Sequence, residues 1–271
     1  MKNPLAKLSN LQQRVIVAVL GIALFFGLIF NGLTPTVCLF SAILLLCLTE
    51  FFSLSPNPIP LPLRFIALGL GLCFFISGFG VIPPLYLFSF LPLLMGFLVF
   101  SPTKKPFEVA GWLVLGVAYL VPSWFCMLLM SGSCSESGFS SSALLGLFGL
   151  LWASDSGAYF AGRTLGKTKL LPRVSPKKTW EGLVGGWMAA SALAFFLSGL
   201  ETPYNLVQWE ILAASTTFFG TLGDLAESVL KRSLDVKDSG SLLPGHGGIL
   251  DRFDGLFICA PVNYFIITAF F

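Results

Sequence analysis

Charged residues are scarce in this sequence. They make up 11% of its 271 residues, against about 25% in an ordinary soluble domain. We find no internal repeat, no low-complexity tract and no linker that would separate off a soluble domain. Hydrophobic residues make up 55% of the chain and the mean hydropathy is +0.86. This composition excludes an ordinary water-soluble domain and is typical of an integral membrane protein.

Cysteine pairs and a signal-peptide cleavage site are absent too. The six cysteines include no C-x-x-C pair, and five of them lie within apolar runs. The pattern therefore predicts neither a zinc site nor a disulfide framework, and we expect small apolar packing residues. The first apolar run is too long for a signal-peptide h-region, and no A-x-A site follows it. We expect this run to be a retained transmembrane helix.

Apolar runs long enough to span a bilayer, which takes ~20 residues, cover almost the whole sequence. They are apolar all round instead of alternating with polar residues, which argues against a β-barrel. The sequence therefore predicts an all-α fold, a polytopic transmembrane helix bundle of about nine spans. The predicted spans are 14–32, 35–53, 63–82, 83–101, 108–131, 142–161, 183–200, 207–230 and 253–271.

The basic residues predict how this bundle is oriented. All 16 lysines and arginines fall on one side of the nine-span arrangement. The loops on the other side, 31–35, 132–141 and 201–206, contain no cation. Because positively charged loops stay in the cytoplasm, we expect the N-terminus inside and the C-terminus outside. The expected location is the cytoplasmic (inner) membrane, with the polar loops facing the cytoplasm.

The two halves of the chain differ in polar content. Residues 1–140 form almost purely apolar spans, for which we expect anchoring, lipid contact and a surface for a dimer partner. Glu50 and Glu108 lie near the inner ends of their spans, where they can reach interfacial water, and we expect no chemistry from them. Residues 141–271 carry ionisable side chains within their spans. Because intramembrane charge is costly, this half is predicted to be catalytic.

Acidic side chains gather where the eighth span ends and the ninth begins. Asp224, Glu227 and Lys231 share a helix face, and a Glu227–Lys231 ion pair would account for two of them. Asp224 lies deeper without a cation at helical spacing, so it should protonate or bind a cation. If the two spans pack antiparallel, Asp224 and Asp251 converge, and carboxylates with water and substrate phosphates suit Mg²⁺. Alternatively, Asp251 and Asp254 cap the ninth helix.

A glycine-rich turn, PGHGGIL, lies between these two spans. Gly247 and Gly248 carry no side chain, so their N–H groups can turn toward an anion. His246, the only histidine in the sequence, can donate to a phosphate oxygen. A glycine turn is by itself a weak indication. The cations around it favour a phosphate as the anion: Lys231, Arg232, Lys237 and Arg252.

A second basic patch follows the sixth span. Asp155, Tyr159 and Arg163 recur every four residues, on a helix face that ends at the cytoplasmic surface. Lys177 and Lys178 precede a helix that we expect to begin near Thr179. They could form a phosphate-binding patch at that helix start or act only as positive-inside determinants. The small residues of that helix form a face suited to tight packing: Gly182, Gly186 and Ala190.

These motifs together resemble one family. They stand in the order and spacing of the phosphatidate cytidylyltransferase (CDP-diacylglycerol synthase) signature: Ser228-x-x-Lys231-Arg232, Lys237-Asp238, His246-Gly247-Gly248 and Asp251-Arg252-x-Asp254. The segments DSGAYFAGR, SPKKTWEG and GDLAES are similar to its companion motifs. The resemblance covers roughly 155–255 and is specific. One small departure is Ser156, which stands where a threonine is more usual.

The resemblance implies an activity and a set of residues for it. CTP and phosphatidic acid would give CDP-diacylglycerol and pyrophosphate, with Mg²⁺ held by Asp224 and Asp251 and, as an open alternative, a second metal or a monovalent cation. The catalytic residues would be Asp224, Asp251, Lys231, Arg252 and His246. The substrate-binding residues would be Lys177, Lys178, Ser175, Arg232, Lys237, Asp155, Gly247 and Gly248. The partners implied are CTP, phosphatidic acid, the lipid bilayer and a second copy in a homodimer, with no nucleic acid.

Two other functions stay open at this point. A related CTP-using lipid enzyme, such as a polyprenol kinase or a synthase acting on an ether-lipid phosphate, would share the metal site and differ in its acceptor. A cation-coupled transporter would use Asp155 and Asp224 as an intramembrane ion site. It would not need so many cations beside a glycine turn and two carboxylates.

Overall fold

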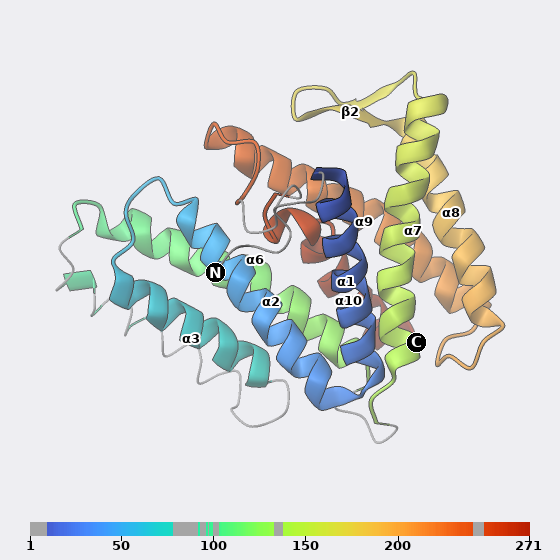
Figure 1. The fold of residues 1–271 in the computed structure, drawn as a ribbon, viewed down its shortest axis with the longest axis horizontal. Coiled ribbons are helices and arrows are strands. Elements are labelled where there is room, and N and C mark those ends of the chain that lie inside the picture. Colours follow the sequence, from blue (N-terminus) through green and yellow to red (C-terminus); the bar gives the residue numbers. More distant parts are fainter. Residues whose placement is uncertain are drawn as a thin grey trace.

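The computed structural model describes residues 10–77, 92, 96, 98–99, 103–132, 138–240 and 247–271, with the side chains of the first helix described from Val19 onward. Eight α-helices, a two-stranded hairpin and a short 3-10 helix, η2, are found in these residues (Figure 1). In chain order they are α1 (Asn10–Phe30), α2 (Leu33–Ser53), α3 (Leu61–Ser77), α6 (Pro106–Met130), α7 (Ser141–Thr164), β1 (Lys169–Leu171), β2 (Ser175–Thr179), α8 (Trp180–Ser198), α9 (Leu206–Ser233), η2 (Leu250–Arg252) and α10 (Leu256–Phe270).

Eight of the nine predicted spans coincide with these helices. By length and composition, α2, α6 and α8 are long and apolar enough to cross a membrane, and α3, α10 and the end of α1 are shorter apolar helices. The helices α7 and α9 are long but carry charged residues. The fourth predicted span, 83–101, lies almost entirely outside the described residues. The apolar helices fit a membrane protein, whereas nine spans and the orientation of the termini stay predictions.

One segment departs from the all-α prediction. The strands β1 and β2 pair antiparallel, with Lys169 opposite Thr179. Pro172 follows β1 directly, and its fixed φ favours a turn over a continued helix. The helix start expected near Thr179 is confirmed, because the Thr179 hydroxyl oxygen accepts a hydrogen bond from the N–H of Gly182 at 3.1 Å. The basic loop is therefore an ordered hairpin that leads directly into α8.

The helices α7 and α8 pack almost backbone to backbone. A Cβ atom at Gly186 would lie 2.7 Å from the carbonyl oxygen of Ser154, and one at Gly157 would lie 2.6 Å from the carbonyl oxygen of Gly185. Glycine is therefore required at both helix surfaces for this approach. The predicted tight packing of the small-residue face is confirmed.

The last helix joins the two halves of the chain. The helices α2, α3 and α6 pack together, α7, α8 and α9 form a second group, and α10 packs against both α6 and α9 (Figure 1). Ser123 on α6 donates to the carbonyl oxygen of Phe257 on α10 at 2.9 Å. Asn263 on α10 donates to the hydroxyl oxygen of Thr216 on α9 at 2.7 Å. Residues 1–140 and 141–271 consequently share one core.

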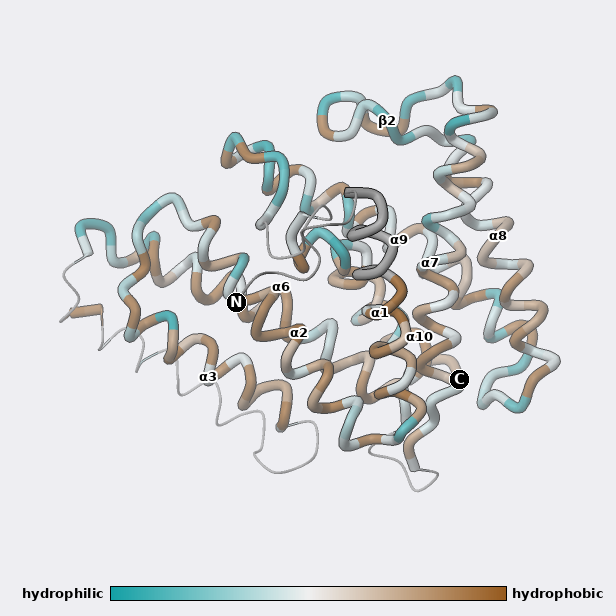
Figure 2. Tube along the Cα trace, in the orientation of Figure 1, coloured by the Kyte–Doolittle hydropathy of each residue, from teal (hydrophilic) through white to brown (hydrophobic). Residues whose placement is uncertain are grey.

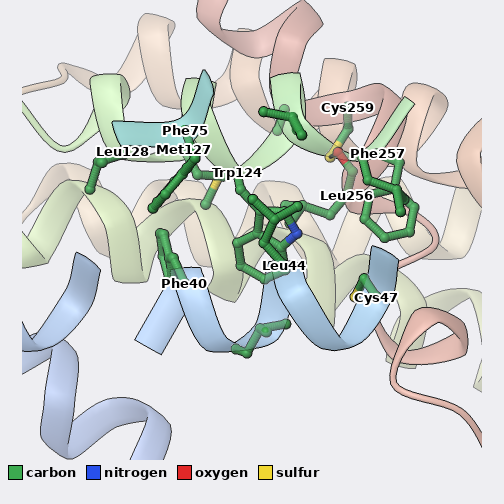
Figure 3. Packing of buried hydrophobic residues seen from close by; sticks show 14 of the residues in the cluster. Phe40, Leu44, Cys47, Phe75, Trp124, Met127, Leu128, Leu256, Phe257 and Cys259 are labelled. Carbon is green, nitrogen blue, oxygen red and sulfur yellow. Dashed lines mark hydrogen bonds between the residues drawn. The ribbon is translucent and has the colours of Figure 1, made fainter. Parts of the chain in front are cut away.

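Aromatic side chains dominate that shared core. Trp124 on α6 is fully buried, with ring centroids 5.0 Å from Phe40 and 4.9 Å from Phe253. Figure 3 shows side chains of α2, α6 and α10 meeting there. Tilted and edge-on aromatic pairs of this kind bury large apolar areas. Three cysteines are buried as free thiols, as expected for packing residues: Cys47, Cys126 and Cys259.

Hydrophilic segments gather along one edge of the molecule. Figure 2 shows the β1–β2 hairpin and the end of α9 on the same side of the helices. The basic hairpin and the segment between α9 and η2 were separate motifs in the sequence. The fold places both at the same end of the bundle.

Candidate active site

A first charged cluster lies between β2, α7, α9 and the start of α10. It comprises Lys178, Asp155, Asp224 and Asp254, and we call it the Asp224 cluster. The Nζ atom of Lys178 lies 2.5 Å from Oδ2 of Asp224 and 3.5 Å from the carbonyl oxygen of Thr221. The cation that Asp224 lacks at helical spacing therefore comes from the hairpin.

Asp254 brings a third carboxylate to this cluster. Its Oδ1 accepts a hydrogen bond from the N–H of Gly255 at 2.8 Å. The charges of Asp224 and Asp155 act on this carboxylate. The segment around Asp254 approaches α9 closely at Gly223, which has no side chain. A Cβ atom on Gly223 would lie 2.5 Å from the carbonyl oxygen of Asp254. Three parts of the chain, α7, α9 and the segment before α10, thus place carboxylates close enough to interact electrostatically with one another.

A second cluster joins α9 to η2. The Nζ atom of Lys231 lies 3.1 Å from Oε1 of Glu227 and 2.7 Å from Oδ1 of Asp251. The Glu227 side chain is fully buried and the Lys231 side chain is 13% exposed. The predicted Glu227–Lys231 pair is confirmed, and Asp251 is its third member. We call these three residues the Lys231 cluster.

The Asp251 carboxylate also binds the backbone of the loop. Its Oδ2 accepts hydrogen bonds from the N–H groups of Ser239 and Gly248, both at 3.0 Å. Burial alone would raise the pKa of Asp251, but the hydrogen bonds from Lys231 and these backbone groups hold it at about 2. The Gly248 N–H thus already has an anionic partner within the protein. Gly247 has a φ of 79°, the left-handed conformation expected of a glycine turn.

The other predicted site residues belong to neither cluster. Ser175 begins β2 and is half-buried, and the guanidinium of Arg252 lies beside Gly247. His246 lies outside the described residues. Four predicted phosphate-binding cations are exposed, which suits the capture of a polyanion from solution: Lys177, Arg232, Lys237 and Arg252.

The Asp224 cluster has the chemistry that a divalent cation requires. It contains three carboxylates and one lysine, which pairs with Asp224, and oxygen donors with excess negative charge suit Mg²⁺. The Asp251 carboxylate, the second ligand expected, is occupied by Lys231 and by two backbone N–H groups. Among the described residues, no three His, Cys, Asp or Glu side chains are arranged so that they could hold a metal ion together. The Asp224 cluster matches a cation in charge and donor type only.

One residue of the first half, which was not among the predicted site residues, reaches the site. Glu50 on α2 is 9% exposed, and its Oε2 accepts hydrogen bonds from the Ser239 hydroxyl at 3.2 Å and the Leu250 N–H at 2.9 Å. The expectation that Glu50 reaches interfacial water was wrong. A signal existed, because Glu50 is the only acidic residue in the first 107 and lies in an apolar run. Glu108 is exposed and pairs with Lys105.

Comparison with known proteins decides the family. The cytidylyltransferase family model matches residues 12–270. The chain belongs to the cytidylyltransferase family. It is therefore a nucleotidyltransferase, and the resemblance carried by residues 155–255 extends over almost the whole sequence, including α2, α3 and α6.

Individual relatives of this cytidylyltransferase carry a more specific name. The phosphatidate cytidylyltransferase of Bacillus subtilis is 34% identical over 270 residues, which cover 96% of this chain and 99% of the relative. That of Haemophilus influenzae is 49% identical over 128 residues, 45% of this chain and 44% of the relative. That of Brucella suis is 42% identical over 154 residues, 57% of this chain and 56% of the relative.

Proposed function

We propose that this cytidylyltransferase transfers the cytidylyl group of CTP to phosphatidic acid, giving CDP-diacylglycerol and pyrophosphate for phospholipid synthesis. The observation that carries the proposal is the similarity to a phosphatidate cytidylyltransferase along 96% of the chain. The site supports it, because both substrates are polyanions and must meet among cations. The hairpin and the α9–η2 segment supply cations from two directions at one edge of the helices.

In the proposed reaction, an oxygen of the lipid phosphate attacks the α-phosphorus of CTP. A new P–O bond forms as the bond to pyrophosphate breaks, and pyrophosphate carries away the electron pair. The attacking oxygen is already ionised near neutral pH, so the reaction needs no strong general base. The protein's contribution is then positioning and electrostatic stabilisation. The residues proposed to bind phosphates are Lys177, Lys178, Lys231, Arg232, Lys237, His246 and Arg252.

The proposal includes a Mg²⁺ ion held by Asp224, with Asp155 and Asp254 close by. When bound, Mg²⁺ neutralises phosphate charge and orients the reacting groups. Asp251, proposed from the sequence as the second ligand, can join only if Lys231 and the backbone N–H groups release part of its carboxylate. While these contacts persist, the Asp251 carboxylate holds the loop backbone through Ser239 and Gly248.

The proposal also includes the surroundings of the enzyme. The hydrophilic edge would face the cytoplasm, where CTP is dissolved, and phosphatidic acid would enter from the inner membrane between the helices. The exposed apolar side chains of α8, among them Trp187 and Phe195, suit contact with lipid. The homodimer implied by the family resemblance belongs to the same proposal.

A direct assay tests the activity. Purified protein in lipid micelles is given labelled CTP, Mg²⁺ and phosphatidic acid, and we expect labelled CDP-diacylglycerol. Chelation of Mg²⁺ should stop turnover and added Mg²⁺ should restore it. Parallel reactions with a polyprenol or an ether-lipid phosphate test the related enzymes. Folded protein that makes no CDP-diacylglycerol would rule out the proposed function.

Two substitutions test the metal assignment. Asp224→Asn should abolish turnover by removing a proposed ligand while the protein still inserts into membranes. Asp251→Asn should abolish it as well, by releasing Lys231 and the loop. The matched control is Asp235→Asn, because Asp235 is exposed in the same segment and its φ of 54° is a conformation that asparagine tolerates. Substantial activity in Asp224→Asn would show that Asp224 is not a required metal ligand.

A further inference from the structure

Glu50 is an isolated carboxylate in an apolar part of the molecule. It lies in the last turn of α2 beside Phe51 and Phe52, both 1% exposed, and one turn after the fully buried Cys47. Burying a carboxylate is unfavourable unless donors compensate it. An acidic residue here has no role in lipid contact, so its partners must account for it.

Those partners lie on either side of the glycine-rich turn. Oε2 of Glu50 accepts from Ser239 at one end and from the Leu250 N–H, 200 residues away in sequence, at the other. A Cβ atom on Gly240 would lie 2.6 Å from Oε1 of Glu50. The carboxylate is thus inserted against the loop backbone, with α2 in contact with η2.

Glu50 and Asp251 hold the same loop from opposite sides. Ser239 donates its N–H to Asp251 and its hydroxyl to Glu50. Leu250, whose N–H reaches Glu50, directly precedes Asp251 in η2. Loss of Glu50 would leave the Leu250 N–H and the Ser239 hydroxyl without this buried acceptor. The loop would then lose one of the two carboxylates that hold its ends together.

We propose that Glu50 is a positioning residue for cytidylyl transfer, which holds Ser239 and Leu250 so that Gly247, Asp251 and Arg252 keep their arrangement around the substrates. Glu50 acts through the loop without touching CTP or lipid. It gives the first half of the chain a part in the reaction. The inference rests on the proposed function, because it assumes that this loop binds the substrates.

The test compares Glu50→Ala, Glu50→Gln and Glu108→Ala. Alanine removes the acceptor, and we expect kcat/KM for CTP per folded molecule to fall about 10- to 100-fold, as displaced catalytic groups do. Glutamine keeps an acceptor oxygen and should stay within about threefold of the unchanged protein. Glu108 is the matched control, a carboxylate near the inner end of α6 with a 55% exposed side chain, and its loss should change neither kcat nor KM.

Ser239→Ala completes a double-mutant cycle. It should lower kcat/KM less than Glu50→Ala, because the Leu250 N–H keeps its partner. It should add nothing when Glu50 is already alanine. If Glu50→Ala does not fold, Ser239→Ala alone still tests the contact, because it removes the hydroxyl that donates to Glu50. An unchanged kcat/KM in Ser239→Ala would then overturn the proposal.

Amide hydrogen exchange supplies a readout that does not need turnover. Exchange in a peptide covering 247–256 should rise in Glu50→Ala and return to the original rate in Glu50→Gln, while a peptide from α7 stays unchanged. The positioning role is overturned if Glu50→Ala keeps its kcat, KM and exchange rates, or if alanine and glutamine lose activity equally. If the protein without substitutions makes no CDP-diacylglycerol but the Glu50 variants show the expected exchange rates, the proposed function is contradicted and the positioning role is not.

Discussion

Lys231 illustrates how single residues hold this site together. It contacts Glu227, which is fully buried, and Asp251, whose side chain is 8% exposed. One cation therefore compensates two acidic groups in a poorly hydrated place. Removing one member of a buried ion pair is more damaging than replacing the whole pair, because it leaves an uncompensated charge.

Replacing Lys231 by methionine should therefore destabilise the protein. Lys231→Met keeps the length of the side chain and removes the charge, and we expect the free energy of unfolding to fall by about 3–5 kcal/mol. Denaturant titration in detergent measures the change. Arg232→Met is the matched control, because Arg232 is the next residue on α9 and is exposed. Equal stability of the two variants would show that the Lys231 cluster contributes little.

At the scale of elements, the approach of α7 to α8 determines where the hairpin lies. Glycines at the contact let the two helices meet through their backbones, and β1 and β2 connect their ends. Lys178 on β2 reaches Asp224 on α9 because α8 packs on both α7 and α9. Helix packing thus carries the hairpin to the carboxylates.

A bulky residue in this contact should separate the two helices. Gly186→Leu puts a side chain where the Ser154 carbonyl oxygen lies 2.7 Å from the Cβ position, and overpacking of this kind destabilises by about 1–3 kcal/mol. The apparent melting temperature in detergent should fall. Gly111→Leu on α6 is the control, since nothing lies within 4 Å of its Cβ position. Similar melting temperatures for both variants would contradict the close contact.

At the scale of the whole molecule, α10 brings a distant part of the chain to the site. It packs between α6 and α9, so the segment that precedes it lies next to α2. One helix of residues 1–140, α2, therefore contacts the loop through Glu50. The hydrophilic edge that results contains the hairpin and the end of α9 (Figure 2).

The predicted orientation of that edge can be measured by cysteine labelling. In a cysteine-free background, Arg173→Cys in the hairpin turn should react with an impermeant reagent only in inside-out vesicles, because basic loops stay in the cytoplasm. Glu201→Cys, in the cation-free loop before α9, should react only in right-side-out vesicles. Both positions are exposed. The reverse pattern would overturn the orientation, and labelling of both from one side would overturn the span count.

Local sequence accounts for much of the fold and for part of the site. Long apolar runs predict the helices because a membrane span needs little beyond length and hydrophobicity. Spacing along one helix predicts the Glu227–Lys231 pair because residues four apart share a face. The hairpin at 169–179 was missed, because its strands are short and carry no alternating pattern.

The sequence by itself determined the membrane class of this protein, through its composition, and its family, through the order of its motifs. Only the tertiary structure decided that Lys178 pairs with Asp224 and that Glu50 binds Ser239 and Leu250. The physical reason is that a sequence pattern reports only on contacts between residues near one another in the chain. Periodicity encodes contacts within one helix, whereas these contacts join different elements and depend on how closely the helices between them can pack.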